Sequence, residues 1–200
     1  MKYFSLSLLL IVTFFSLGIT SPELNNVTIN NSVYNIIYSQ DFEQPLEITY
    51  NIECNRNSKK YYSRKGLNFY KPNGIHTSDD ADYYNNAWDK GHMAPAADFN
   101  CDLNSLQLTF SYVNCAIQHQ DLNRGQWKIL ESYEKELAIN NKVTIKIFVD
   151  FVGSTRSTTG AMIPKGFTKI IYLNGNKFKA YYFPNKKLGG SYEKYLINKN

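Results

Sequence analysis

Few side chains in this sequence could carry acid–base or nucleophilic chemistry, and two short segments hold the best of them. Only three histidines occur, His76, His92 and His119, and none is paired at the spacing of a zinc protease. The sequence contains neither a Gly-x-Ser-x-Gly motif nor a phosphate-binding Gly-Lys-Ser/Thr loop. A catalytic site must therefore be built around one histidine and a few oxygen-bearing and cationic side chains.

The first segment is DKGHMAPAAD at residues 89–98. Gly91 permits a tight backbone before His92, and Pro95 fixes the chain after it. A histidine on such a rigid segment suits general-base work, because its usual pKa lies near neutrality. Taken alone, His92 fits a hydrogen-bonded structural role in a loop better than a catalytic one.

The second segment is LNRGQW at residues 122–127, followed by Glu131. Asn123 offers a neutral amide oxygen, and hard cations such as magnesium accept oxygen ligands while keeping most of their waters. One amide, several waters and a substrate phosphate would complete such a site. Taken alone, Asn123 fits the N-cap of a helix better than a metal ligand.

Together the two segments resemble one family, the DNA/RNA non-specific endonucleases, which are the endonuclease G-like ββα-metal nucleases. The resemblance starts at residues 89–98 and continues through TFSYVNCAIQ at 109–118 and LNRGQWKILE at 122–131. Farther on, IPKGFTKI and FPN resemble the family's C-terminal strands. The match spans roughly residues 40–197, which is far more specific than a lone motif.

The resemblance implies a role for each matching residue. His92 falls on the general base that activates water, and Asn123 falls on the single protein ligand of Mg²⁺, for which Mn²⁺ is the expected substitute. Glu131 falls on a carboxylate that orients water around the metal, and Asn114 on an asparagine that supports the site's geometry. Eight residues of ideal helix rise about 12 Å, so Glu131 is not expected to bind the metal directly alongside Asn123.

Three cations are expected to hold phosphates. Lys90 stands where the family has an arginine, and lysine lacks the bidentate fork of the guanidinium, so the phosphate grip is expected to be weaker. Arg124 is near in sequence and could take over this task. Arg64 aligns loosely with a phosphate-binding arginine of the family, and Arg56 competes for that assignment.

The function that the resemblance implies is magnesium-dependent hydrolysis of DNA and RNA with low sequence specificity, leaving 5′ phosphates. One rival is a secreted polyanion-binding protein without catalysis, which would use the basic residues Lys59, Lys60, Arg64 and Lys65. Another is a phosphodiesterase of small phosphoesters that uses the same site. Relatives in this family are often dimers, and the sequence leaves a homodimer open.

The elements that must position these residues are expected to form an α+β fold, with a mainly antiparallel central sheet flanked by helices and a ββα-metal core. Alternating or buried apolar runs predict strands at 46–54, 106–113, 143–152, 167–173 and 178–183, with a hairpin turn at 174–176. Helical spacing predicts a helix at 127–137. Polar composition predicts a surface lead-in at 22–35 and loops at 55–66 and 71–86.

The N-terminus and the cysteines bear on location. Residues 1–20 have the basic start, apolar run and small residues of a secretory signal peptide, and 21–200 form one expected domain. Secretion without stable membrane association is therefore expected; an uncleaved anchor and a mitochondrial presequence are the rivals. Of Cys54, Cys101 and Cys115, the sequence does not say which two would pair. Acceptor patterns for N-glycosylation occur at Asn26 and Asn30.

The bulk composition narrows the functional classes. A hydrophobic content of 43% supports a packed core and argues against a disordered chain. The formal net charge of +5 favours polyanionic partners mildly, because counterion release drives cations onto phosphate chains.

Overall fold

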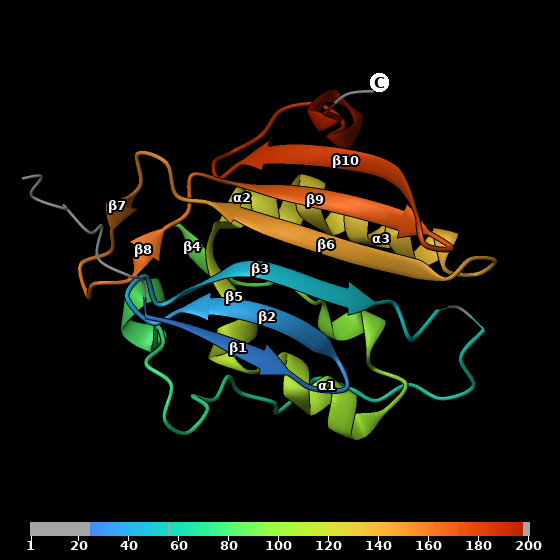
Figure 1. Ribbon diagram of the computed structural model, residues 1–200, viewed down its shortest axis with the longest axis horizontal. Helices are drawn as coiled ribbons and strands as arrows, with labels where there is room; N and C mark the ends of the chain where they lie inside the picture. The colour runs from blue at the N-terminus through green and yellow to red at the C-terminus, as the bar shows by residue number, and fades with distance from the viewer. Residues whose placement is uncertain (1–24, 56, 198–200) are drawn as a thin grey trace, which may run out of the picture.

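The computed structural model describes residues 25–55 and 57–197 of the chain. Its largest element is a six-stranded sheet in which all neighbouring strands run antiparallel (Figure 1). In spatial order the strands are β1 (Asn26–Asn30), β2 (Tyr34–Ser39), β3 (Gln44–Asn51), β6 (Val143–Asp150), β9 (Gly166–Leu173) and β10 (Asn176–Pro184). Strands from both ends of the described chain therefore share one sheet, and the segment 52–142 crosses between β3 and β6.

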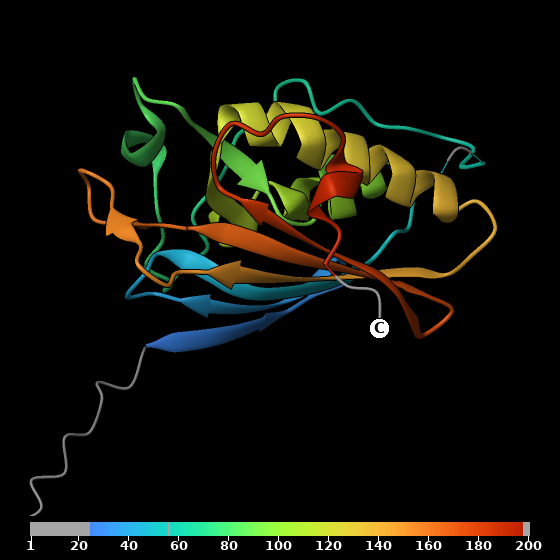
Figure 2. The same ribbon diagram turned by 90° about the horizontal axis from the view of Figure 1, so that it is seen from above.

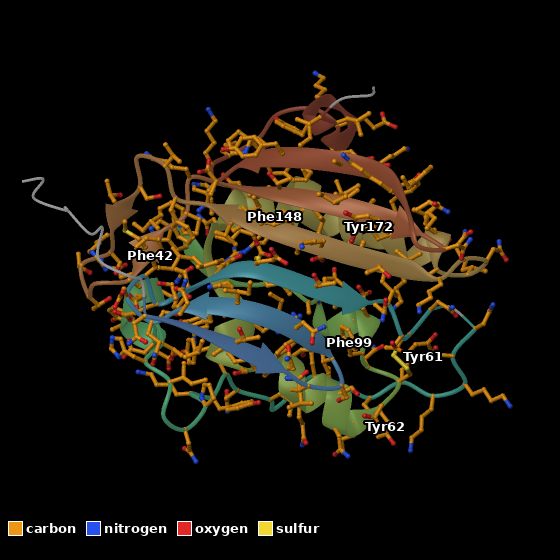
Figure 3. The ribbon with its side chains drawn as sticks, viewed as in Figure 1. Phe42, Tyr61, Tyr62, Phe99, Phe148 and Tyr172 are labelled. Carbon is orange, nitrogen blue, oxygen red and sulfur yellow. A yellow bond between two sulfur atoms is a disulfide. The ribbon has the colours of Figure 1, made fainter. Side chains whose placement is uncertain are left out.

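The two faces of the sheet differ, as strand β6 illustrates. Val143, Ile145 and Ile147 are buried, and the alternate residues point to the opposite face. Figure 3 shows Phe148 and Tyr172 on that opposite face, where Phe148 is 37% exposed. The sheet thus has one face packed on the core and one face open to solvent.

The helices lie on one side of the sheet (Figure 2). They are α1 (Leu103–Thr109), α2 (Gln120–Leu122) and α3 (Lys128–Leu137). Trp127, at the start of α3, is fully buried, and its ring packs edge-on against Phe167 of β9 and Phe183 of β10 at centroid distances of 5.4 and 5.8 Å. This aromatic contact attaches α3 to the sheet.

A two-stranded ribbon and the helix that follows it form a separate ββα unit. Strand β4 (Trp88–His92) pairs antiparallel with β5 (Cys115–His119). From β5 the chain enters α2, then the π-helical turn Asn123–Trp127, then α3. The turn is kinked at Gly125, whose φ of −105° and ψ of −112° are not helical. The architecture is therefore α+β with a ββα core, which confirms the predicted fold class.

The segment 106–113 was expected to be a strand, and that prediction is wrong. Its first residues belong to α1, and residues 112–114 form a short 3-10 turn. The side chain of Asp102 caps α1 by accepting a hydrogen bond from the Ser105 backbone N–H. Leu106 and Phe110, four residues apart, lie on the same side of this turn of chain and are buried together. Residues 106–113 fit both an alternating and a helical spacing of apolar residues, and the Asp102 cap favours the helix.

The polar lead-in expected at 22–35 is also wrong over its described part. Residues 26–30 form β1, an edge strand paired along its whole length with β2. Val27 and Ile29 alternate with exposed polar residues and pack against the core. Asn26 and Asn30, the two glycosylation acceptors, are exposed on this edge.

The other predicted elements are found, with shifted ends. Strands β3, β6, β9 and β10 and helix α3 correspond to the predicted segments. The predicted hairpin turn consists of Asn174 and Gly175, with φ values of 51° and 86°. Both residue types tolerate this left-handed conformation, which a two-residue hairpin requires. The predicted loop at 71–86 is irregular apart from a 3-10 turn at Asp80–Tyr83.

Cys54 and Cys101 form a disulfide, and Cys115 is free and buried. The bridge ties the end of β3 to the segment before α1. Within the described residues, no helix has the length and apolar character needed to cross a membrane. The predicted signal peptide, residues 1–20, lies outside the described residues.

Candidate active site

A cleft of about 760 Å³ opens where the end of β4 meets the start of α3. It is lined by six of the seven residues that the sequence singled out: Arg64, Lys90, His92, Asn123, Arg124 and Glu131. The seventh, Asn114, is buried directly behind it. The fold thus brings together side chains that are spread over 68 positions of sequence, from 64 to 131.

His92 is the last residue of β4 and is held between two aromatic rings. The Phe69 and Phe110 rings lie 4.8 and 4.9 Å from the imidazole, measured between ring centroids. Its Nε2 is buried and has no hydrogen-bond partner in the described part of the chain. Burial, and secondarily the charge of Arg64, lower the pKa of His92 to about 3. The ring is therefore neutral, and able to accept a proton, across the neutral pH range.

Asn114 fixes the backbone that follows His92. Its Oδ1 accepts a hydrogen bond from the Ala94 N–H at 2.8 Å, and its Nδ2 donates to the carbonyls of Ala94 and Thr109, each at 2.9 Å. Its own carbonyl accepts from the Met93 N–H at 2.9 Å. The amide is thus committed to positioning, and it does not face the cleft.

Gly91 lets β4 lie close to β5. A Cβ at this position would lie 2.4 Å from Oε1 and 2.6 Å from Cβ of Gln118, a buried residue of β5. No larger residue fits without moving Gln118. Glycine before His92 is therefore required by the close approach of the two strands, and the backbone needs no special φ here.

Asn123 is oriented by Asp89, the first residue of the DKGH segment. Asn123 Nδ2 donates to Asp89 Oδ2 at 2.8 Å. Because a carboxylate only accepts hydrogen bonds, the amide nitrogen must face Asp89, and the amide oxygen Oδ1 is left for another partner. Arg124 donates to both oxygens of the same carboxylate, at 2.9 and 2.6 Å. Asp89 therefore holds both residues at the kinked turn.

Lys90 lines the cleft but is already paired. Its Nζ forms an ion pair with Asp80, and the Tyr112 hydroxyl donates to the same carboxylate. The amine lies 5.5 to 5.8 Å from the ring centroids of Phe69, Tyr83 and Tyr112. The pKa of Asp80 is lowered by its hydrogen bonds from Lys90 and Tyr112. These partners hold the amine at one side of the cleft.

Other cations surround the opening. Arg64 is exposed on the loop before Phe69 and lines the cleft near His92. Lys128 and Lys135, from one face of α3, line it as well. Arg56, the competing candidate for the role of Arg64, lies outside the described residues. The rim is therefore basic, as a polyanion site requires.

Acidic side chains also line the cleft. Asp98 and Glu131 line the cleft, and the fully buried pair Glu134–Lys169 lies behind them with an N–O distance of 3.0 Å. Burial raises the pKa of Glu131 to about 7, and Lys169 opposes this rise. Burial and the neighbouring Glu131 and Glu134 raise the pKa of Asp98 well above its usual range. Glu134 is bonded to the buried amine of Lys169, and Asp98 and Glu131 lie near enough for its charge to oppose the rise of their pKa values.

The sequence did not single out Asp89 or Asp98 as site residues, although Asp89 begins and Asp98 ends the motif around His92. Nor did it identify the Phe69–Phe110 pocket around the imidazole, because these rings come from segments far from His92 in the chain. Only the position of Asp89 at the start of the histidine motif could have drawn attention to this carboxylate.

The chemical groups in the cleft support a limited set of reactions. It offers a neutral imidazole, a free amide oxygen near carboxylates, and cations at the rim. Among the described residues, no cluster of three or more His, Cys, Asp or Glu side chains is placed to hold a metal ion. The amide oxygen of Asn123 and the carboxylate of Glu131 are oxygen donors of the kind that a hard cation accepts.

The chain is similar to known nucleases in sequence and in fold. The family model of the DNA/RNA non-specific endonucleases matches residues 13–199. The chain is 36% identical over 63 residues to the mitochondrial nuclease EXOG of Danio rerio, covering 32% of this chain and 18% of that protein. It is 31% identical over 78 residues to mitochondrial endonuclease G of Bos taurus, covering 38% and 26% of the two chains. The aligned parts thus span about a quarter or less of these relatives.

A solved structure of a complex between EndoG and EndoGI has a similar fold. The TM-score is 0.73 at 19% sequence identity, covering 86% of this chain and 80% of that one. At this identity the likeness concerns the fold alone.

Proposed function

The chain belongs to the DNA/RNA non-specific endonuclease family, and from that premise we propose that it hydrolyses phosphodiester bonds of DNA and RNA with little regard for sequence. The observation that carries the proposal is the single cleft in which His92, Asn123 and Glu131 meet a rim of cations. Each residue alone has a structural explanation. Their convergence in one cleft of about 760 Å³ does not.

His92 is proposed to be the general base. Its neutral ring takes a proton from the water that attacks phosphorus. An anionic phosphate in the cleft would offset the charge of Arg64, which is one of the two causes of the lowered pKa of His92. Substrate binding would therefore raise this pKa and make the ring a stronger base. Asn114 keeps the ring in place through residues 93 and 94.

Asn123 is proposed to bind a divalent cation, Mg²⁺ with Mn²⁺ as a substitute, through Oδ1. The site fits this ion because the amide oxygen is free, Asp89 contributes negative charge and orients the amide, and Glu131 is a further carboxylate in the cleft. When bound, the cation supplies positive charge against the negative charge that develops on the phosphate and the leaving 3′ oxygen. Glu131 is proposed to accept hydrogen bonds from water in the cleft and so to orient it.

Lys90, Arg64 and Arg124 are proposed to hold the phosphates on either side of the reacting one. These three cations are proposed to contact phosphates and not the edges of bases, so weak sequence preference follows. Lys90 and Arg124 are both paired with carboxylates, and a phosphate must share them with Asp80 and Asp89. Cleavage between phosphorus and the 3′ oxygen leaves products with 5′ phosphates.

The chain is also proposed to be secreted, with residues 1–20 as a signal peptide and 21–200 as one domain. The pattern of the N-terminus, the Cys54–Cys101 disulfide and the exposed acceptors Asn26 and Asn30 support this. The relatives named above are described as mitochondrial, so the alternative is a mitochondrial presequence. N-terminal sequencing of the protein recovered from the medium of expressing cells, with a start near residue 21, would support secretion. Recovery in mitochondria would contradict it.

Digestion of several substrates tests the activity. Purified protein is incubated with supercoiled plasmid, structured RNA and a mononucleotide phosphodiester, with Mg²⁺ and with a chelator. Metal-dependent cutting of both polymers with 5′-phosphate ends is expected. Turnover of the mononucleotide ester alone would identify a small-molecule phosphodiesterase. Binding of all polymers without cleavage would leave a polyanion-binding protein. Light scattering of the same sample tests whether the protein is a monomer or a homodimer.

A further inference from the structure

A second hollow adjoins the cleft on the far side of the aromatic rings that hold His92. Its volume is about 490 Å³, within the range of small-ligand pockets. It lies between the loop 67–70 and helix α1, and its lining residues are Leu67, Asn68, Tyr70, Asn104, Gln107, Leu108 and Phe110. Leu67 and Phe110 line both this hollow and the cleft, so the two spaces share a wall.

The hollow is built on fixed backbone. The Tyr70 N–H donates to the Phe110 carbonyl at 2.9 Å, and the Tyr112 N–H donates to the Tyr70 carbonyl at 3.0 Å. These bonds hold the loop against the chain that leaves α1, while the ring of Tyr70 remains 40% exposed. A large aromatic side chain is thus kept at the surface by its backbone and is not buried by folding.

Three of the side chains that line this hollow carry carboxamide groups. Asn68, Asn104 and Gln107 are exposed, and their carboxamides make no hydrogen bond to any described residue. No charged side chain lines the hollow. An aromatic ring, apolar side chains and free carboxamides, without charge, suit a neutral and planar polar ring. They do not suit a phosphate.

We propose that this hollow receives the unpaired base of a nucleotide next to the scissile phosphate. The inference rests on the proposed function and names a part of its substrate site. The occupant follows from continuity: Phe110 packs 4.9 Å from the His92 ring, between ring centroids, and also lines the hollow. A strand whose phosphate lies at His92 therefore has a neighbouring nucleotide at the entrance.

Recognition there accepts any base. Every base has a face that can stack on Tyr70, and a carboxamide offers both donors and an acceptor to whichever edge is presented. The subsite thus agrees with low sequence specificity. A base must leave its duplex to enter, so single-stranded nucleic acid is cut faster than a duplex of the same sequence.

Cleavage of a single-stranded DNA oligonucleotide that carries one abasic position tests the proposal. The full protein digests the end-labelled strand, and the products are resolved at single-nucleotide resolution beside those of the intact strand. Loss of one stacked base costs about tenfold, so one bond at a fixed offset from the abasic position is expected to be cut about tenfold less. Moving the abasic position moves the protected bond with it.

Variants separate the hollow from a general effect of the missing base. Tyr70→Ala and Gln107→Ala are expected to cut the intact strand more slowly and to lose the protected bond, whereas Tyr70→Phe keeps it. Tyr84→Ala is the matched control, because Tyr84 is 83% exposed and lines neither space. It should behave as the wild type. Gln107 is exposed on α1, so its truncation leaves the core intact.

The results separate a failure of the proposed base subsite from a failure of the proposed nuclease function. Uniform cutting of the abasic strand by the wild type, or a protected bond that persists in both Tyr70→Ala and Gln107→Ala, overturns the base subsite and leaves the nuclease standing. Absence of any cutting of the intact strand overturns the proposed function and the subsite with it.

Discussion

Replacement of Asp89 by alanine is predicted to weaken metal binding more than it weakens the fold. Asp89 receives three hydrogen bonds, one from Asn123 and two from Arg124. Without it, the Asn123 amide is free to turn and no longer presents Oδ1 in one direction. Loss of a residue that orients a metal ligand typically costs 10- to 100-fold in metal affinity, which corresponds to about 1.4–2.7 kcal/mol.

The effect on stability is expected to be smaller than the three bonds suggest. The side chain of Arg124 is 67% exposed, so solvent screens its pair with Asp89 and the pair contributes little to stability. The bond from Asn123 to the carboxylate contributes about 1.5 kcal/mol or more. Urea unfolding should therefore show a modest loss in Asp89→Ala, with the protein folded at assay temperature.

The assay is the initial rate of plasmid nicking as a function of Mg²⁺ concentration. The concentration that gives half the maximal rate should rise 10- to 100-fold in Asp89→Ala, while the rate at saturating Mg²⁺ falls less. Asp121→Ala is the matched control, because Asp121 is exposed on the adjacent α2 and its carboxylate does not bond Asn123. An unchanged Mg²⁺ requirement in Asp89→Ala, or an equal shift in both variants, would refute the reasoning.

Three further predictions concern the fold around the site. The pKa of His92 is lowered from 6.5 to about 3 in the folded state, so the stability that the neutral ring contributes is complete above pH 6.5 and is lost as the pH falls toward 3. Between a pH above 6.5 and pH 4.5, the metal-free wild type should lose about 2–3 kcal/mol of unfolding free energy that His92→Phe keeps. Urea unfolding of both proteins at these two pH values measures the difference. Gly91→Ala should destabilise the protein by about 1–3 kcal/mol through its contact with Gln118. A double-mutant cycle with Gln118→Gly, which removes both the Oε1 and the Cβ that the new methyl group would meet, should recover most of this; additive losses would contradict it. Replacing both Cys54 and Cys101 by alanine opens a loop of 47 residues and should cost up to about 4 kcal/mol by chain entropy; an unchanged unfolding midpoint would show that the bridge adds nothing.

The parts of the fold that were predictable are those whose pattern has one interpretation. The apolar run of β6 and the Asn174–Gly175 turn each specify one structure, and both are found. Residues 106–113 carry two periods at once, and only the Asp102 cap and burial against Ala96 decide for a helix. Strand β1 is short and polar, and it is stabilised by pairing with β2, whose residues lie 5 to 13 positions farther along the chain, which the pattern of β1 alone does not reveal.

For the site, the segments were predictable and their connections were not. His92 and Asn123 stand in short motifs that the family shares. The bonds from Asn123 and Arg124 to Asp89 join positions 34 and 35 residues apart. The grouping of Asp98 and Glu131 with the buried Glu134–Lys169 pair depends on how α3 packs on β9. Such contacts come from tertiary packing, which a single sequence does not encode in any local spacing.

The most direct measurement compares wild type with His92→Ala for cleavage and for binding of the same plasmid and structured RNA in Mg²⁺. The wild type is expected to cut both. The variant should bind both with similar affinity and cut more slowly by a factor on the order of 10²–10⁴, the usual contribution of a general base. Cleavage by His92→Ala at the wild-type rate would contradict the account, and so would intact substrates with the wild type itself.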